Sequence, residues 1–259
     1  MIRPRLTVCL LLQDGGLVKT VRFSDPKYVG DPLNAVRIFN EKEVDELIVL
    51  DINATKESRE PNFRLIEQLA SECNMPLCYG GGISRTDEVQ RLISLGVEKV
   101  ALGAAAIETP EIISEASRIV GQQSVVVVID VAAAGILKRP TVFVRNGSKK
   151  VGASPTEVAI NAQNYGAGEI LINSIDRDGS MVGYDLELAK KVKSSVQVPV
   201  TCLGGAGDLG HIKSLHHAVG LVGAAAGSLF VFKGKYRAVL INYPNAIEKR
   251  ELFADFSND

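Results

Sequence analysis

Short apolar runs alternate with amphipathic segments along the whole chain. In the segment 62–70, for example, Phe63, Ile66 and Leu69 stand three residues apart, which is helical spacing. A second such segment, 110–120, opens with Pro110, a residue favoured in the first turn of a helix. Continuous apolar runs are typical of parallel strands that are joined by crossover helices. The predicted strands are eight in number and span residues 6–11, 46–51, 76–80, 99–103, 124–130, 169–174, 200–204 and 220–224.

Two connections between these elements are longer than the others. Residues 13–31 follow the first strand and are predicted to form a long loop. Residues 139–152 follow the fifth strand and contain Asn146-Gly147, a pair typical of a tight hairpin turn. We therefore expect a β-hairpin after the fifth strand.

The same order of features occurs twice, about 120 residues apart. Residues 45–104 contain a strand, a helix, a strand that ends in Gly80-Gly81-Gly82, and a further strand that runs into alanines. Residues 168–228 repeat this order, with glycines at 204, 205 and 207 and a final strand that runs into Ser228. Such self-similarity indicates two fused halves.

The chain has 259 residues and no linker or break in composition. Eight strand–helix units and this length fit one barrel of about 250 residues. We therefore predict an α/β fold, a single TIM (β/α)8 barrel domain over residues 1–259, with half-barrel repeats at about 1–120 and 121–259. The active site is then expected where the strands end. A doubly wound open sheet is the alternative, but it would not need the repeat.

Charge and composition exclude several classes of protein. The net charge is −1 and no basic block occurs, which argues against a nucleic-acid or membrane-surface partner. The apolar run near the N-terminus is too short for a signal peptide or a membrane span, so a cytoplasmic location is expected.

The cysteines and histidines give no sign of a metal site. The four cysteines show neither zinc spacing nor a disulfide framework, and they are expected to be packing residues in a reducing cytosol. They are Cys9, Cys73, Cys78 and Cys202. The three histidines all lie between residues 211 and 217 and are expected on a solvated helix face. No metal and no cofactor is predicted.

Two glycine runs point to phosphate. Gly80-Gly81-Gly82 and Gly204-Gly205-Ala206-Gly207 each end a strand and precede a helix. Glycines there let backbone N–H groups approach an anion near a helix N-terminus, although glycine also serves tight turns alone. Their matching positions in the two halves predict a ligand with two phosphates that lies across the barrel mouth.

Carboxylates also stand at the predicted strand ends. Asp130 ends the very apolar fifth strand and is a candidate general acid or base with a raised pKa, or else a cap of the following turn. Asp51 ends the second strand in the same way, with the same two interpretations. Residues 174–179 bring a hydroxyl, two carboxylates and a guanidinium to the end of the sixth strand, for a ligand or for a turn with a surface ion pair. In the first half, the place that corresponds to Asp130 is taken by Leu11.

Four charged residues mark the opposite end of the barrel. They stand at or just before strand starts and are Arg5, Glu46, Lys99 and Glu169. Two cations and two anions at the barrel floor could form a ring of ion pairs. From the residues alone, ordinary stabilisation of the fold is the favoured interpretation of that ring.

These residues resemble the HisF family, the cyclase subunit of imidazole glycerol phosphate synthase, over essentially the whole chain. The resemblance implies a catalytic role for Asp130. It implies phosphate or substrate binding by Lys19, Asp51, Gly82, Asp178, Gly179, Gly205, Gly227 and Ser228. It further implies that a HisH-like glutaminase subunit docks on the N-terminal face as a heterodimer partner. Ammonia would then pass through the barrel to a phosphorylated small-molecule substrate. Under this resemblance, the charged ring of Arg5, Glu46, Lys99 and Glu169 is an ammonia gate rather than a stabilising plug.

The chain departs from the family where cyclisation chemistry is expected. The family uses aspartates at the ends of strands one and five, but this chain has Leu11 at the first. It also has Gly103-Ala104 where the family has Asn-Thr, Leu203 in place of a serine, and Asn173 in place of a threonine. A positioned acid or base contributes about 10²–10⁴ in rate, or roughly 3–5 kcal/mol, so its loss favours a changed substrate.

The pattern resembles a divergent HisF-like branch linked to surface-polysaccharide synthesis. That resemblance implies delivery of ammonia to a separate ATP-dependent enzyme, which turns a sugar's acetamido group into an acetamidino group. One alternative is a cyclase of histidine biosynthesis that makes imidazole glycerol phosphate and AICAR. Another is a scaffold that only docks and activates a glutaminase.

Overall fold

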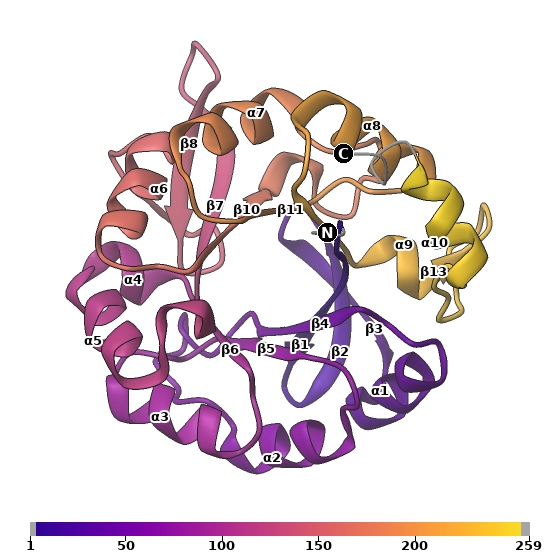
Figure 1. Cartoon of the computed structure of the whole chain (residues 1–259), viewed down its shortest axis with the longest axis horizontal. Coiled ribbons are helices and arrows are strands. Elements are labelled where there is room, and N and C mark those ends of the chain that lie inside the picture. The colour runs from indigo at the N-terminus through magenta and orange to yellow at the C-terminus, as the bar shows by residue number, and fades with distance from the viewer. Residues whose placement is uncertain (1–3, 255–259) are drawn as a thin grey trace.

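The computed structural model describes residues 4–254, in which eight parallel strands close into a barrel with helices outside (Figure 1). Around the barrel the strands are β1 (Leu6–Gln13), β4 (Glu46–Asp51), β5 (Leu77–Gly80), β6 (Lys99–Leu102), β7 (Val125–Ala134), β10 (Glu169–Ser174), β11 (Val200–Leu203) and β12 (Gly223–Ala226). β12 pairs with β1 and β7 pairs with β10, so the sheet has no open edge. The predicted TIM barrel is confirmed, and the open sheet is wrong.

The helices alternate with these strands. The long ones are α1 (Pro32–Glu41), α2 (Phe63–Glu72), α3 (Thr86–Ser94), α5 (Glu111–Val120), α6 (Pro155–Asn164), α7 (Leu186–Ser195) and α8 (Leu209–Val219). Shorter helices are α4 (Ala104–Glu108), α9 (Ser228–Val231) and α10 (Ala246–Leu252), with 3-10 turns at Gln122–Ser124 and Ile175–Arg177. Local sequence explains their starts: the Asn62 side chain accepts a hydrogen bond from the Leu65 N–H and caps α2. No helix over residues 4–254 is long and apolar enough to cross a membrane.

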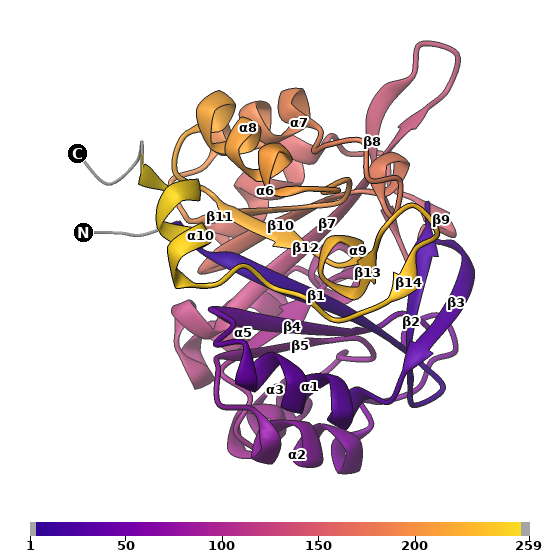
Figure 2. The same ribbon diagram turned by 90° about the vertical axis from the view of Figure 1, so that its right-hand side faces the viewer.

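An antiparallel excursion follows the first strand of each half. After β1 the chain forms β2 (Gly16–Val21) and β3 (Ser24–Gly30), and after β7 it forms β8 (Arg139–Val144) and β9 (Lys149–Lys150). The hairpin expected over 139–152 is confirmed. The loop expected over 13–31 is wrong, because Asp14 and Gly15 both have positive φ and turn the chain into a hairpin. Both excursions lie at the end of the barrel where the strands finish (Figure 2).

The last barrel strand begins later than the sequence indicates. It spans Gly223–Ala226 rather than 220–224, because Gly220 with φ 82° still belongs to the end of α8. The fifth strand runs beyond Asp130 to Ala134, since its last residues pair with β8.

Side-chain alternation divides the apolar residues into two layers. Outward residues of the strands pack against the helices and form the main core. A smaller cluster fills the barrel interior and consists of Cys9, Ile48, Cys78, Ala101, Val126, Val128 and Leu171. All four cysteines are free thiols, and three of them are fully buried, as packing residues should be.

The expectation of a solvated histidine face is wrong for His216. Its side chain is 1% exposed, and its ring nitrogens lie 3.0 Å and 2.9 Å from the carbonyl oxygens of Ile212 and Val222. Helical periodicity explains the placement, because Ile212, Leu215 and His216 form the buried face of α8.

We expect His216 to make stability depend on pH. Burial lowers the pKa of His216 below its usual value of 6.5, so the unfolded chain binds a proton more readily than the folded protein. The melting temperature of the wild type should therefore fall as pH drops below about 6.5. His216→Gln should reduce that slope. Equal slopes in the two proteins would contradict the assignment.

Candidate functional site

The floor of the barrel holds a closed ring of ion pairs. Glu46 opens β4 and lies 2.5 Å from Lys99 and 3.4 Å from Arg5. Glu169 opens β10 and lies 2.9 Å from Lys99 and 2.8 Å from Arg5. Each carboxylate therefore contacts both cations. The structure brings together all four residues that the sequence placed at strand starts.

Burial disfavours the charged forms of Lys99 and Glu169 in this ring, but the opposite charges of their neighbours outweigh that effect. Burial alone would lower the pKa of Lys99, yet the carboxylates of Glu169 and Glu46 raise it above its usual value. Burial alone would raise the pKa of Glu169, yet Arg5 and Lys99 hold it below its usual range. Lys99 and Glu169 are thus kept ionised in a setting where a lone charge would be strongly unfavourable.

Two buried threonines complete the ring from above. The Thr7 hydroxyl donates to Glu46 at 3.1 Å, and the Thr201 hydroxyl donates to Glu169 at 2.6 Å. The small apolar cluster of the barrel interior follows directly above them. From floor to mouth, the side chains of the barrel interior therefore change from charged groups to hydroxyls and then to apolar groups.

At the mouth, Asp130 on β7 stands beside Asn173 on β10. The two residues are direct partners in the strand register, and the Asn173 side-chain N–H donates to Asp130 Oδ1 at 2.9 Å. Burial raises the pKa of Asp130 to about 7, against the opposing effect of the Asn173 hydrogen bond. A carboxyl that titrates near neutral pH can serve as a general acid or base, as the sequence indicated.

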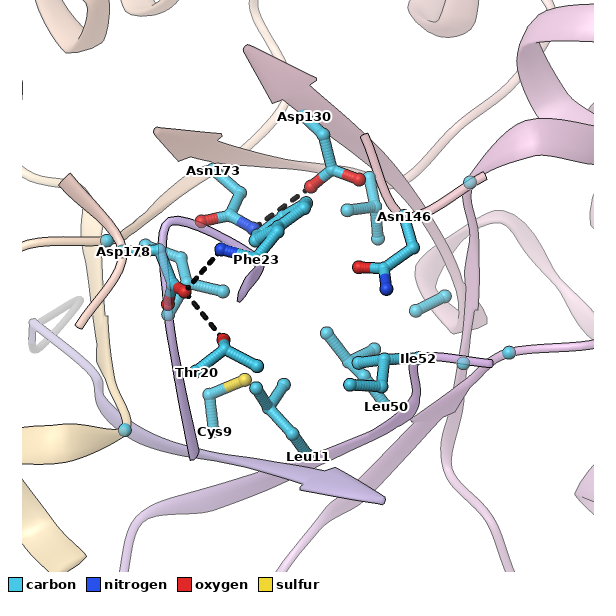
Figure 3. Close-up of a pocket in the computed structure, with 18 of the residues that line it drawn as sticks. Cys9, Leu11, Thr20, Phe23, Leu50, Ile52, Asp130, Asn146, Asn173 and Asp178 are labelled. Carbon is cyan, nitrogen blue, oxygen red and sulfur yellow. Dashed lines mark hydrogen bonds between the residues drawn. The ribbon is translucent and has the colours of Figure 1, made fainter. Parts of the chain in front are cut away.

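The opposite side of the mouth is apolar. The first half carries Leu11 and Leu50 at the corresponding pair of positions, where β1 and β4 are in register. Figure 3 shows Leu11, Leu50 and Ile52 facing Asp130 and Asn173 across the cavity. The two half-barrels thus present a hydrogen-bonded pair on one side and two leucines on the other.

Lys19 comes from β2 and is buried beside the mouth. Its ammonium group donates to the Cys9 carbonyl oxygen at 2.6 Å, and burial lowers its pKa. Gly227 faces it, and a Cβ at Gly227 would collide with Lys19 Nζ. The hairpin after β1 is what delivers this cation to the cavity wall.

Asp178 ties that hairpin to the far side of the barrel. Its Oδ2 accepts hydrogen bonds from the Thr20 hydroxyl at 2.7 Å and from the Phe23 N–H at 3.3 Å. Burial raises its pKa despite these bonds. Asp176 in the same segment accepts from the Ala133 N–H at 2.7 Å. The polar segment 174–179 therefore anchors both excursions, while Asp178 and Gly179 also line the cavity.

Glycines wall the mouth on two opposite sides. Gly81 and Gly82 follow β5, Gly204 and Gly205 follow β11, and all four have positive φ. A Cβ would collide with the Asp51 carbonyl oxygen at Gly81 and with the Gly183 carbonyl oxygen at Gly205. Close backbone packing thus requires these glycines whether or not an anion binds. The short helices α4 and α9 begin beside them, and Gly103, Ala104, Gly227 and Ser228 also line the cavity.

Asp51 both lines the mouth cavity and caps the turn that follows β4. Along β4, Leu50 faces the interior cluster, so Asp51 stands at the outer edge of the mouth rather than on the barrel axis. Its Oδ1 accepts from the N–H groups of Asn53 at 3.1 Å and Ala54 at 3.0 Å, and Arg59 lies 3.7 Å from Oδ2. Its capping role is therefore shown, and substrate binding by Asp51 stays a prediction.

Sequence reasoning missed Thr20, Phe23 and Asn146 in the mouth, all of which line the cavity. They come from the two excursions, and only the pairing of those hairpins brings them there. Among residues 4–254 no group of three or more His, Cys, Asp or Glu side chains could hold a metal ion.

Comparison with known proteins gives one consistent answer. The histidine biosynthesis protein family matches residues 5–237. A protein of Leptospira borgpetersenii, provisionally named imidazole glycerol phosphate synthase subunit HisF, is 56% identical over 253 residues, 98% of this chain and 100% of the relative. One of Vibrio vulnificus, provisionally named subunit hisF3 of that synthase, is 53% identical over 251 residues, 97% of this chain and 96% of the relative.

A third relative, from Metallosphaera sedula, bears the name imidazole glycerol phosphate synthase subunit HisF without qualification. It is 42% identical over 230 residues, 89% of this chain and 91% of the relative. Together with the closed barrel, the floor ring and the two glycine walls, these matches place the chain in the HisF family of imidazole glycerol phosphate synthase subunits.

Proposed function

We propose that this HisF-like subunit conducts ammonia from a HisH-like glutaminase, docked at the barrel floor, to the mouth. Its most favoured role is in the cytoplasm, supplying ammonia to a separate ATP-dependent enzyme that amidinates a surface-polysaccharide sugar. The observation that carries the proposal is a contrast between the two ends of the barrel. The floor ring of Arg5, Glu46, Lys99 and Glu169 is complete, while the mouth has Asp130 opposite Leu11.

The floor ring supports the first half of the proposal. The ring closes the barrel interior at the end where the strands begin, and each of its carboxylates contacts both cations. A docked partner that draws one cation away would open it. The apolar cluster above the ring suits a small neutral molecule and disfavours ions.

The mouth supports the second half. Two proton-transfer groups are expected of a cyclase, whereas here Leu11 and Leu50 form a hydrocarbon wall opposite Asp130. Hydrocarbon cannot exchange a proton with a substrate. Transit of ammonia needs no second acid or base at that place.

A histidine-pathway cyclase is the second candidate, and specific observations favour it. Asp130 has a pKa of about 7, and the glycine walls stand on opposite sides of the mouth, as a bisphosphorylated substrate would need. Lys19, Asp178, Gly82, Gly179, Gly205, Gly227 and Ser228 would then contact that substrate. Asp51, which caps the turn after β4 and lines the same cavity, would contact it as well.

Opening the gate should uncouple ammonia transfer from glutamine hydrolysis. In a reconstituted complex with the glutaminase and the ATP-dependent enzyme, Arg5→Ala and Lys99→Ala should lower the ratio of amidinated product to glutamate about tenfold, because ammonia escapes at a broken ring. Lys149→Ala removes an exposed cation that pairs with Glu108 and serves as the control. An unchanged ratio in the ring variants would favour the scaffold that only activates the glutaminase.

Cyclase activity should be weak and should respond to Leu11. With ammonia and the bisphosphorylated precursor, Leu11→Asp should form imidazole glycerol phosphate about 10²-fold faster than the wild type, since it adds the missing carboxylate. Leu11→Asn, of similar size but unable to act as a base, should not gain. Fast turnover by the wild type, or rescue of a histidine auxotroph by this gene alone, would establish the cyclase instead.

The titration of Asp130 can be measured directly. Its folded pKa of about 7 exceeds its usual value of 3.8, so the folded protein retains a proton that the unfolded chain has lost. Asp130 should therefore reduce stability as pH rises from about 4 to about 7, and Asp130→Asn should remove that loss. Carboxyl chemical shifts and melting temperatures test this, with the exposed Asp25→Asn as control. A midpoint near 4 for Asp130 would refute the assignment.

A further inference from the structure

Asn173 carries a buried carbonyl oxygen without a hydrogen-bond donor. Among the side chains of residues 4–254, two buried polar atoms lack a partner, Asn173 Oδ1 and the Tyr79 hydroxyl. Asn173 is only 5% exposed, and it lines the wall of the mouth cavity, so its oxygen is approached from the cavity rather than from the outer surface. Buried acceptors are almost always paired, and an exception at a cavity wall points to a ligand.

The two unpaired atoms lie on different faces of the barrel wall. Tyr79 belongs to the outward core between strands and helices. Asn173 alternates with Glu169 and Leu171, whose side chains belong to the ring and to the interior cluster. It also lines the mouth cavity. Only the Asn173 oxygen therefore stands on the route from floor to mouth.

Asp130 fixes which way the Asn173 amide points. The Asn173 N–H group donates to the Asp130 carboxylate at 2.9 Å, so the carbonyl oxygen is directed away from Asp130 (Figure 3). A flipped amide would set two oxygens against each other. Gly204 leaves room beside that oxygen, since a Cβ there would lie 3.2 Å from Oδ1.

The chemistry around Asn173 selects a small hydrogen-bond donor. The interior cluster below it offers only apolar groups and buried thiols. Lys19, a buried cation that lines the mouth, is already bonded to the Cys9 carbonyl oxygen. An anion would meet the Asp130 carboxylate, whereas ammonia brings three N–H donors to an acceptor that has none.

We propose that the Asn173 side-chain carbonyl, held in place by Asp130, binds ammonia where it leaves the barrel interior. This inference rests on the proposed function, in which ammonia crosses the barrel. The first half has Leu50 at the corresponding position and offers no such acceptor. Ammonia is thus delivered to the β7–β10 side of the mouth, next to the carboxyl of Asp130, and Asn173 acts as a positioning residue.

The test uses the purified chain with ammonium chloride as the probe at alkaline pH, where more of it is ammonia. In an isotope-labelled sample, the side-chain amide signals of Asn173 should shift saturably. Sodium chloride at equal ionic strength should leave them in place. No shift, or the same shift with sodium, would overturn the proposal.

Asn173→Leu provides the matched variant, because it copies the residue of the other half-barrel. It should fold, as thermal unfolding will show, and its Asp130 should respond to ammonium at least about tenfold more weakly than in the wild type. Loss of the Asn173 hydrogen bond should also raise the pKa of Asp130 above about 7. An equally strong ammonium response in this variant would overturn the assignment to Asn173.

A last comparison separates this inference from the proposed function. In the reconstituted complex, Asn173→Leu should increase the loss of ammonia to solvent at the mouth several-fold. The ring variants should instead lose ammonia at the floor of the barrel. If ammonium binds at Asn173 but ammonia is not transferred to the amidinating enzyme, the Asn173 site stands and the sugar-amidination role is refuted. If ammonia is transferred but no ammonium-specific binding is seen at Asn173, the role stands and the Asn173 site is refuted.

Discussion

Closure of the sheet is the constraint on which every other feature depends. Since β7 pairs with β10 and β12 with β1, every second residue of each strand must point into one enclosed interior. Strand β10 shows the result, with Glu169 in the ring, Leu171 in the apolar cluster and Asn173 at the mouth. Polarity therefore varies along the barrel axis in layers, and that order gives the two ends different chemistry.

The barrel and the layers of its interior could largely be predicted, because they depend on where each strand begins and ends and on the alternation of side chains along it. Continuous apolar runs between amphipathic segments locate the barrel strands, and charged residues at the strand starts locate the ring. Asp51 shows the limit, since its place at a strand end does not reveal that its carboxylate caps the following turn while it lines the cavity. The unpaired oxygen of Asn173 depends on register with Asp130, which belongs to another strand. The expectation of a solvated face is wrong for His216, because its spacing from Ile212 and Leu215 places it on the buried face of α8.

The two halves agree in architecture and differ in one pair of side chains. Both have an antiparallel excursion after their first strand and both end in a glycine wall beside a short helix. At the top layer, however, the register pairs Leu11 with Leu50 in one half and Asp130 with Asn173 in the other. Within this layer, the side-chain hydrogen bond, the carboxyl with a raised pKa and the unpaired acceptor all lie on the β7–β10 side.

The hairpin after β1 has a consequence for how the mouth can work. β2 is paired along β1, the Arg22 N–H donates to the Asp178 carbonyl oxygen at 3.0 Å, and Thr20 and Phe23 hold the Asp178 carboxylate. To swing across the opening, this segment would have to break all of these bonds together. The hairpin is a fixed wall rather than a lid, so it cannot close over a molecule held in the mouth. Shielding of such a molecule from solvent must then come from a partner seated on the rim and not from this hairpin.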